Sequence, residues 1–158
     1  METEKYLKRI ATLKTAAECE AFIKNATRLD RGDLVEVAIR RKVELGASAV
    51  GGTTAAELEG WKAINAYEET LFRRHGKKTK ASRTRQMISR LGMVPSIEKI
   101  VCEREWDTQG AMALYQVGLG DYTFEAIVTR YPGEFSDSAL AQAELKLEKA
   151  KLIQLGDT

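Results

Sequence analysis

Residues 54–76, with the sequence TAAELEGWKAINAYEETLFRRHG, have the spacing of a helix that packs one face against a core. Their large apolar side chains recur at helical steps, which place them on one face: Leu58, Trp61, Ile64, Leu71 and Phe72. Thr54 stands three residues before Glu57, a pairing that caps a first helical turn from both sides. Gly76 follows the last turn, where a left-handed residue ends a helix. The stretch therefore predicts one long amphipathic helix over 55–75.

The same features recur along the chain of 158 residues. Two more pairs of a short polar residue and a glutamate mark helix starts, Thr15 with Glu18 and Asp33 with Glu36. No segment of five or more residues alternates with the period of a strand, and no Asn-Gly or Asp-Gly turn predicts a hairpin. We therefore expect an all-α protein, a multi-helix domain of about nine short helices. They are predicted over 3–14, 16–28, 34–45, 55–75, 83–91, 96–105, 110–117, 123–131 and 137–154.

A segment of small uncharged residues, 47–53, predicts a linker, and Gly46 just before it is placed to end a helix. The linker would separate an N-terminal helical unit, 1–46, from a C-terminal helical domain, 54–158, that carries a strongly basic segment. Because so short a chain rarely folds alone, we expect the N-terminal unit to dock on the remainder or on another subunit.

The composition also bears on location. An apolar share of 44% and a charged share of 30% fit a chain that folds around a core. The charged N-terminus leads into no secretory apolar region, and no apolar stretch approaches the ~20 residues that span a bilayer. Cys19 and Cys102 have no further cysteine partners, which favours a reducing compartment. We therefore expect a cytoplasmic location and no membrane partner.

Charge is strongly polarised along the chain, although the net charge is only +2. Residues 70–97 contain eight lysines and arginines and no acidic residue, whereas the rest of the chain holds 17 basic and 23 acidic side chains. Polyanion binding needs such polarisation, because each neutralised phosphate releases condensed counterions. We expect this segment to contact nucleic acid, the alternative being a solvated charged loop. The candidate contact residues are Arg73, Arg74, Lys77, Lys78, Lys80, Ser82, Arg83, Thr84, Arg85, Arg90 and Lys99.

The helix predicted over 83–91 begins inside this basic segment. Arg83 and Arg85 fall in its first turn, where the helix dipole is positive and a cation costs about 0.3–1 kcal/mol. With Ser82 as N-cap and Thr84 as a second hydroxyl, these residues would bind a phosphate at the helix N-terminus. We expect replacement of both arginines by glutamine to weaken DNA binding while the fold stays intact or gains slightly in stability.

Residues 84–101 resemble a helix-turn-helix DNA reader. The positions of that family's apolar residues and turn glycine are filled by Met87, Leu91, Gly92, Met93 and Val101. The pattern departs from the family at Ile88, Ile97 and Glu98. The resemblance implies a second helix in the major groove, with a small polar set of Ser96, Glu98 and Lys99. The alternative is two ordinary helices joined by a glycine turn.

A longer run, HGKKTKASRTRQMISRLG over 75–92, is similar to uncharacterised bacterial all-α proteins, as are residues 118–128 and 131–136. This resemblance implies a bacterial or phage origin and carries no activity with it.

Few residues offer catalytic or metal-binding chemistry. The one histidine, His75, stands at a predicted helix end, where the dipole favours a cation. Zinc needs about four ligands at close spacing, and the two cysteines lie far from this histidine. Glu68 and Glu69 could hold Mg²⁺ beside a phosphate, but Glu69 and Arg73 also have the spacing of a helical ion pair, which we favour. We therefore expect no catalytic residue, no metal and no cofactor.

The leading interpretation is a small non-catalytic protein that binds DNA, in preference to RNA, through the basic segment. One alternative is a protein-interaction module, such as an inhibitor or adaptor, whose basic face binds an acidic partner. A second alternative is a metal-dependent enzyme that acts on nucleic acid. A protein partner or a homodimer is compatible with each of these.

Overall fold

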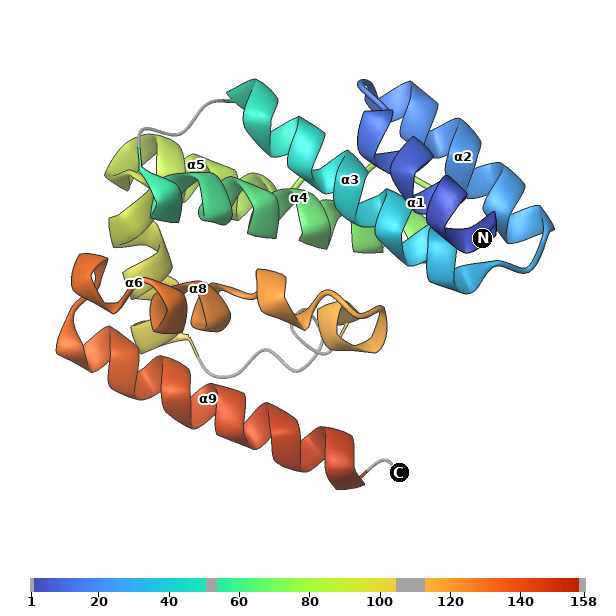
Figure 1. Ribbon diagram of the computed structural model, residues 1–158. Helices are drawn as coiled ribbons and strands as arrows, with labels where there is room; N and C mark the ends of the chain where they lie inside the picture. The colour runs from blue at the N-terminus through green and yellow to red at the C-terminus, as the bar shows by residue number, and fades with distance from the viewer. Residues whose placement is uncertain (1, 51–53, 105–112, 157–158) are drawn as a thin grey trace. The chain divides into compact units, whose positions relative to one another are not determined.

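The computed structural model describes residues 2–50, 54–104 and 113–156 (Figure 1). All regular secondary structure in these residues is helical, so the predicted all-α fold is confirmed. The chain divides into two compact units, Met1–Gly51 and Gly52–Thr158. Within the described ranges, the helices fall short of the length and apolarity that a membrane span requires.

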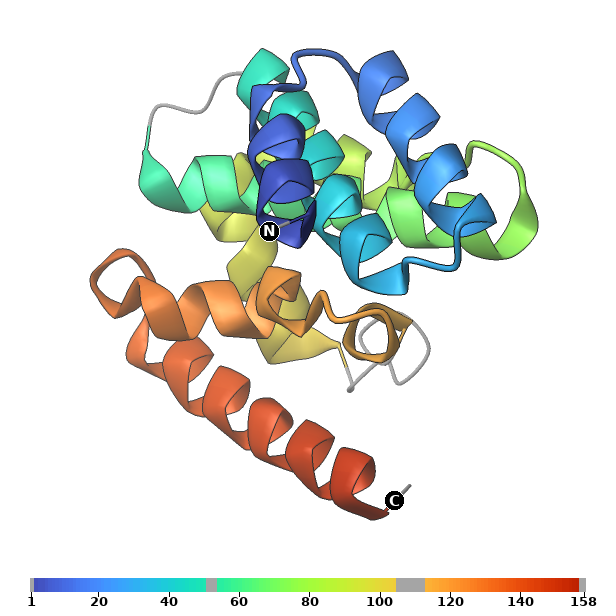
Figure 2. The same ribbon diagram turned by 45° about the vertical axis from the view of Figure 1, so that its right-hand side comes forward.

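The first unit consists of α1 (Glu2–Thr12), α2 (Ala16–Arg28) and α3 (Gly32–Val50). Both shorter helices pack on α3 (Figure 2), around a small core of Ile10, Ile23, Ala26, Leu34 and Ala38. The predicted cap of α2 is confirmed, because the Thr15 hydroxyl accepts a 3.1 Å hydrogen bond from the Glu18 N–H. The Glu18 carboxylate reaches back to the N–H of Lys14, at 2.9 Å, instead of that of Thr15.

Helix α3 is longer than the sequence predicts. It does not end at Gly46, which lies inside the helix, and residues 47–50 of the predicted linker are helical. The reason is an apolar stripe along this helix, where Val43 and Ala47 are both buried one helical turn apart. A glycine in a helix interior costs about 1 kcal/mol, which this packing offsets. Residues 51–53 of the predicted linker lie outside the described residues.

The second unit has α4, α5 and α6 in its first half: Ala55–His75, Ser82–Leu91 and Met93–Glu103. Its second half contains helical residues 113–116, two 3₁₀ turns, η1 and η2, and the helices α8 and α9. Their bounds are Gly120–Tyr122 for η1, Phe124–Arg130 for α8, Pro132–Glu134 for η2 and Asp137–Gly156 for α9. The helix predicted over 110–117 lies partly outside the described residues.

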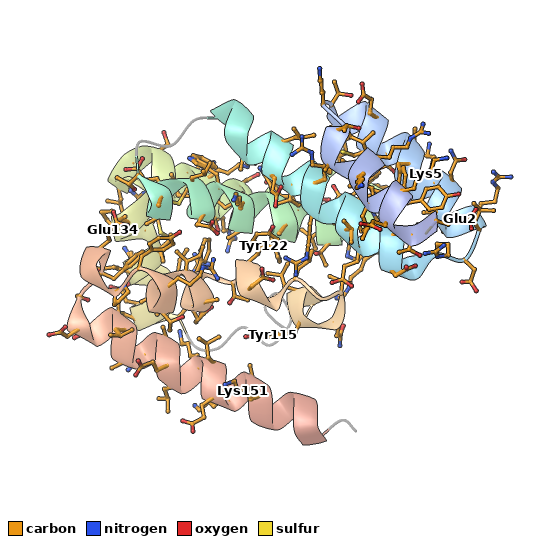
Figure 3. The ribbon with its side chains drawn as sticks, viewed as in Figure 1. Glu2, Lys5, Tyr115, Tyr122, Glu134 and Lys151 are labelled. Atoms are coloured by element: carbon orange, nitrogen blue, oxygen red, sulfur yellow. The ribbon has the colours of Figure 1, made fainter. Side chains whose placement is uncertain are left out.

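Helix α8 lies at the centre of the second unit, where it packs on α4, α6 and α9 (Figure 1). The core receives apolar side chains from all four helices: Ile64, Ile97, Val101, Ile127, Val128, Ala139 and Ala143. Burial of each larger side chain stabilises the fold by about 1.5–3 kcal/mol. Tyr122, marked in Figure 3, is buried where η1 packs on α4.

Both predicted ends of α4 are confirmed. The Thr54 hydroxyl accepts a 3.1 Å hydrogen bond from the Glu57 N–H at the first turn. At the other end Gly76 adopts the left-handed conformation with φ 72°, and its N–H donates to the Phe72 carbonyl at 2.8 Å. The chain therefore leaves α4 at a fixed point, directly before the basic loop 77–81.

Helix α6 begins at Met93, three residues before its predicted start. The side chain of Met93 is buried and lies where a Cβ at Gly60 would overlap it, so the missing side chain lets α6 approach α4. Pro95 falls in the first turn of α6, where its lack of an N–H removes no hydrogen bond from the helix. Proline at this position therefore permits the earlier start of α6, although a proline in a sequence often indicates the end of a helix.

Lys146 of α9 is buried and closes the C-terminus of α6. Its ammonium group donates to the carbonyl oxygens of Val101, at 2.5 Å, and Arg104, at 2.6 Å. The last carbonyls of a helix lack partners within the helix, and the dipole there favours a cation. This contact fixes α9 to α6 at a polar point in addition to their apolar packing.

Candidate nucleic-acid interface

The basic segment forms the end of α4, the loop that follows and all of α5. Arg73 and Arg74 lie in the last turn of α4, where cations interact favourably with the helix dipole. The lysines of the loop are exposed, as are Ser82, Arg83 and Arg90 of α5, whereas Thr84 and Arg85 are half-buried. The candidate residues therefore differ in how far they can reach a ligand.

Arg85 is held by a carboxylate of α4. Its Nε and Nη2 atoms donate to the two carboxylate oxygens of Glu68, each at 2.7 Å, in a bidentate pair. The guanidinium group also lies over the Trp61 ring, 5.6 Å from its centroid. The side chains of Arg85 and Glu68 are only 28% and 12% exposed. The partner of Arg85 is thus intramolecular, and its charge is compensated within the chain.

Glu68 also occupies the N-terminus of α5. Its Oε2 atom accepts a 2.7 Å hydrogen bond from the N–H of Ala81, the N-cap residue of that helix. The prediction that Ser82 is the N-cap is wrong, because Ser82 is the first residue of the helix and its hydroxyl lies 3.5 Å from the Lys80 carbonyl. The carboxylate of Glu68 therefore fills the place where the sequence predicted a phosphate.

The carboxyl group of Glu68 has a pKa below its ordinary value of 4.5. Burial alone would raise this pKa, but the hydrogen bonds from Arg85 and from the Ala81 N–H outweigh burial and favour the charged form. A group with a lowered pKa in the folded state stabilises the fold above its unfolded pKa. That contribution is lost as the pH falls through the folded value.

We expect the free energy of unfolding to fall below about pH 4.5, partly because of Glu68. A Glu68→Gln variant keeps the shape of the side chain without a titratable group, so its stability should decrease less over the same acidic range. Urea denaturation of both proteins at several pH values between neutral and acidic measures the difference. Parallel pH profiles would show that Glu68 titrates alike in the folded and unfolded states.

Glu69 and Arg73 form the predicted helical ion pair, which is confirmed with Oε1 and Nη2 2.7 Å apart. Glu69 is buried, and its carboxylate group contacts this arginine. The two carboxylates directly before the basic segment, Glu68 and Glu69, thus each hold an arginine. Among the described residues, no group of three or more metal-ligating side chains gathers around them.

Arg74 turns toward the second half of the unit, where its Nη2 atom donates to Gln116 Oε1 at 2.7 Å. Gln116 is neutral, so this hydrogen bond leaves the charge of Arg74 uncompensated. His75 is the exposed last residue of α4. Its position at the helix end is as predicted from the sequence, and its role stays a prediction.

Five cations of the segment make no hydrogen bond or ion pair with any other described residue: Lys77, Lys78, Lys80, Arg83 and Arg90. Together with Arg74 they form a set that we call the basic surface. All six are exposed, and they follow one another along the end of α4, the loop and α5. Two of the eight basic residues, Arg73 and Arg85, are therefore structural, and six remain able to meet a ligand.

Helices α5 and α6 meet at the single residue Gly92, with φ 93°, instead of a longer turn. The face of α6 that carries Ser96 is buried, and Ser96 itself has no exposed area. Glu98 accepts a hydrogen bond from the backbone N–H of Ser136, which leaves Lys99 as the exposed member of the predicted polar set. Helix α6 is therefore part of the core, and Ser96 cannot contact a base.

The exposed side of α5 contains two residues that the sequence analysis missed, Gln86 and Ser89. Its inner side is formed by Ala81, Thr84, Arg85, Met87 and Ile88, which are buried or half-buried. The apolar residues Met87 and Ile88 mark the inner face of α5. Helical periodicity therefore could have indicated, from the sequence, that Gln86 and Ser89 lie on the outer face. A prediction based on charge alone does not include these two neutral polar side chains.

No protein-family model, curated protein or solved structure matches this chain.

Proposed function

We propose that the protein binds nucleic acid, duplex DNA in particular, through the basic surface and catalyses no reaction. The observation that supports this function is the set of six exposed cations that form no direct ion pair with a described carboxylate, in a segment that contains no acidic residue between 70 and 97. These cations lie together in a chain that carries net negative charge elsewhere. A polyanion is the kind of ligand that binds favourably to such a concentration of positive charge.

The proposal assigns no catalytic step to the acidic residues nearby. Glu68 and Glu69 each hold an arginine at 2.7 Å, so a divalent metal would have to displace an existing ion pair. The proposal also does not depend on a helix-turn-helix, because α6 contributes its face to the core. The contacts come from the loop and from α5.

The proposal is tested by fluorescence anisotropy with a labelled duplex, the corresponding single strand and an RNA of the same sequence. We expect binding to the duplex that weakens steeply between about 50 and 200 mM salt, with a log–log slope near −0.9 for each phosphate neutralised. If all six cations neutralise a phosphate, that slope should reach about −5.4. The absence of duplex binding at the lowest salt concentration would contradict the proposal and favour an acidic protein partner.

A further inference from the structure

The exposed face of α5 differs in chemistry from the loop that precedes it. The loop presents three lysines, which act on phosphates as point charges. The outer face of α5 presents Arg83, Gln86, Ser89 and Arg90, a mixture of cations and neutral hydrogen-bonding groups. Neutral side chains add no charge for phosphate attraction but can hydrogen-bond to base edges, so this face suggests a second kind of contact.

These four side chains, with Ser82, form one continuous strip. At 100° per residue they cover an arc of about 120°, and Gln86 lies near the middle of that arc. Arg83 lies toward the N-terminal end, next to the loop, and Arg90 lies two turns further on. All of them are exposed. The side chains of Arg83, Gln86, Ser89 and Arg90 make no hydrogen bond or ion pair with another described residue, and the Ser82 hydroxyl lies 3.5 Å from the Lys80 carbonyl.

The inner face holds α5 in place without using this strip. Ile88 is buried in the core of the unit, and Arg85 is fixed by Glu68. The backbone of α5 is thereby supported at both its start and its second half. A rigid helix that presents a polar strip loses little backbone conformational entropy when the strip is bound.

Side chains of these types match the base edges of the major groove. A glutamine can hydrogen-bond to adenine N6 and N7, and an arginine to guanine O6 and N7. A helix with its side chains is about 10–12 Å across, close to the ~12 Å width of the major groove. Helix α5 contains no acidic residue, so no carboxylate of its own would face the phosphates on either side of the groove.

Resting on the proposed function, we propose that α5 lies in the major groove of duplex DNA and reads its sequence through Gln86 and Arg90. Arg83 and the loop lysines hold the adjacent phosphates and set the position of the helix. The recognition helix is then the first helix of the predicted helix-turn-helix, in place of the second.

The test is a selection from a pool of duplexes with a randomised central segment, carried out with the full chain and followed by sequencing. The parent protein should enrich a short motif that contains an A·T and a G·C pair at fixed positions. Gln86→Ala should lose the preference at the A·T position, and Arg90→Ala the preference at the G·C position. Each loss should reduce discrimination against the wrong base by about 5- to 150-fold.

Gln86 is exposed and alanine favours helices, so this variant should fold like the parent, which circular dichroism checks. Gln142→Ala, at an exposed position of α9, is the matched control and should enrich the parent's motif. For the unselected pool, the salt dependence of Gln86→Ala should equal that of the parent, because glutamine carries no charge.

Binding by the parent without enrichment of any motif would overturn this inference and leave the proposed function standing. The same holds if Gln86→Ala and Arg90→Ala both enrich the parent's motif unchanged. No binding to the pool at low salt would overturn the proposed function, and this inference with it.

Discussion

Replacement of Lys77, Lys78 and Lys80 by glutamine is expected to weaken binding to duplex DNA about 500-fold at ~0.1 M salt. Each lysine that neutralises a phosphate releases about 0.9 counterions. At this salt concentration, each such lysine therefore raises the affinity about eightfold. The three lysines are exposed and have no ion-pair partner among the described residues, so their loss should not affect folding. Anisotropy titrations over a range of salt concentrations should show a log–log slope reduced by about 2.7.

The matched control carries the same loss of charge at a distance along the chain from the basic surface. Lys5, Lys24 and Lys151 are exposed on α1, α2 and α9, and the first and last are marked in Figure 3. Their replacement by glutamine changes the net charge equally but should lower affinity far less and keep the slope of the parent. Equal losses in both triple variants would mean that net charge, and not the basic surface, governs binding.

Glu68→Ala is expected to lower the free energy of unfolding by about 2–3 kcal/mol. The change leaves the Arg85 guanidinium over Trp61 without its counter-charge and the Ala81 N–H without its acceptor. Loss of one partner of a fully buried pair costs more, but the Arg85 side chain is 28% exposed and water can solvate part of its charge. Urea denaturation with a tryptophan signal measures the difference.

A double-mutant cycle separates the ion pair from the general effect of removing side chains. The variant that combines Glu68→Ala with Arg85→Ala should be more stable than the sum of the single losses predicts, since no unpaired charge remains. Glu148→Ala, at an exposed position of α9, is the control and should unfold within about 0.5 kcal/mol of the parent. If Glu68→Ala behaved like this control, the pair would be irrelevant to stability.

This expectation reverses the one drawn from the sequence, in which loss of Arg83 and Arg85 left the fold intact or slightly stabilised. In the sequence, the first turn of α5 carries two cations, Arg83 and Arg85, at the positive end of a helix. The structure adds the carboxylate of Glu68, 17 residues before Arg85, which compensates the second cation. Arg83→Gln should still be neutral for stability, whereas Arg85→Gln should be destabilising, because only Arg85 has this partner.

Local patterns predicted the parts of the fold that depend on neighbours in the sequence. The caps of α4 at Thr54 and Gly76 involve residues within four positions of each other, and both were predicted. The contacts of Lys146 with α6 span 42 and 45 residues, and no periodicity indicates them. The end of α3 was misplaced for a related reason, since burial of Ala47 outweighed the local preference of Gly46.

The candidate site also has features that the sequence predicts and features that depend on the fold. The polarised charge of residues 70–97 is visible in the sequence, and so is the pair of Glu69 with Arg73 at one-turn spacing. Which arginines stay available for a ligand depends on side chains brought in from another helix, as Glu68 shows for Arg85. The outer face of α5 is indicated in the sequence only by the apolar residues Met87 and Ile88, and burial of Ile88 in the core fixes which side faces outward.

The carboxylate that Glu68 places at the N-terminus of α5 also bears on which anions the protein distinguishes. A carboxylate already bound at a helix start repels a second anion there, so inorganic phosphate and mononucleotides are expected to bind weakly at this position. Attraction instead accumulates over cations spread along a loop and a helix, each of which is weak alone. Affinity should then grow with the length of the ligand, and the abundant small phosphates of a cell would compete poorly with a long polymer.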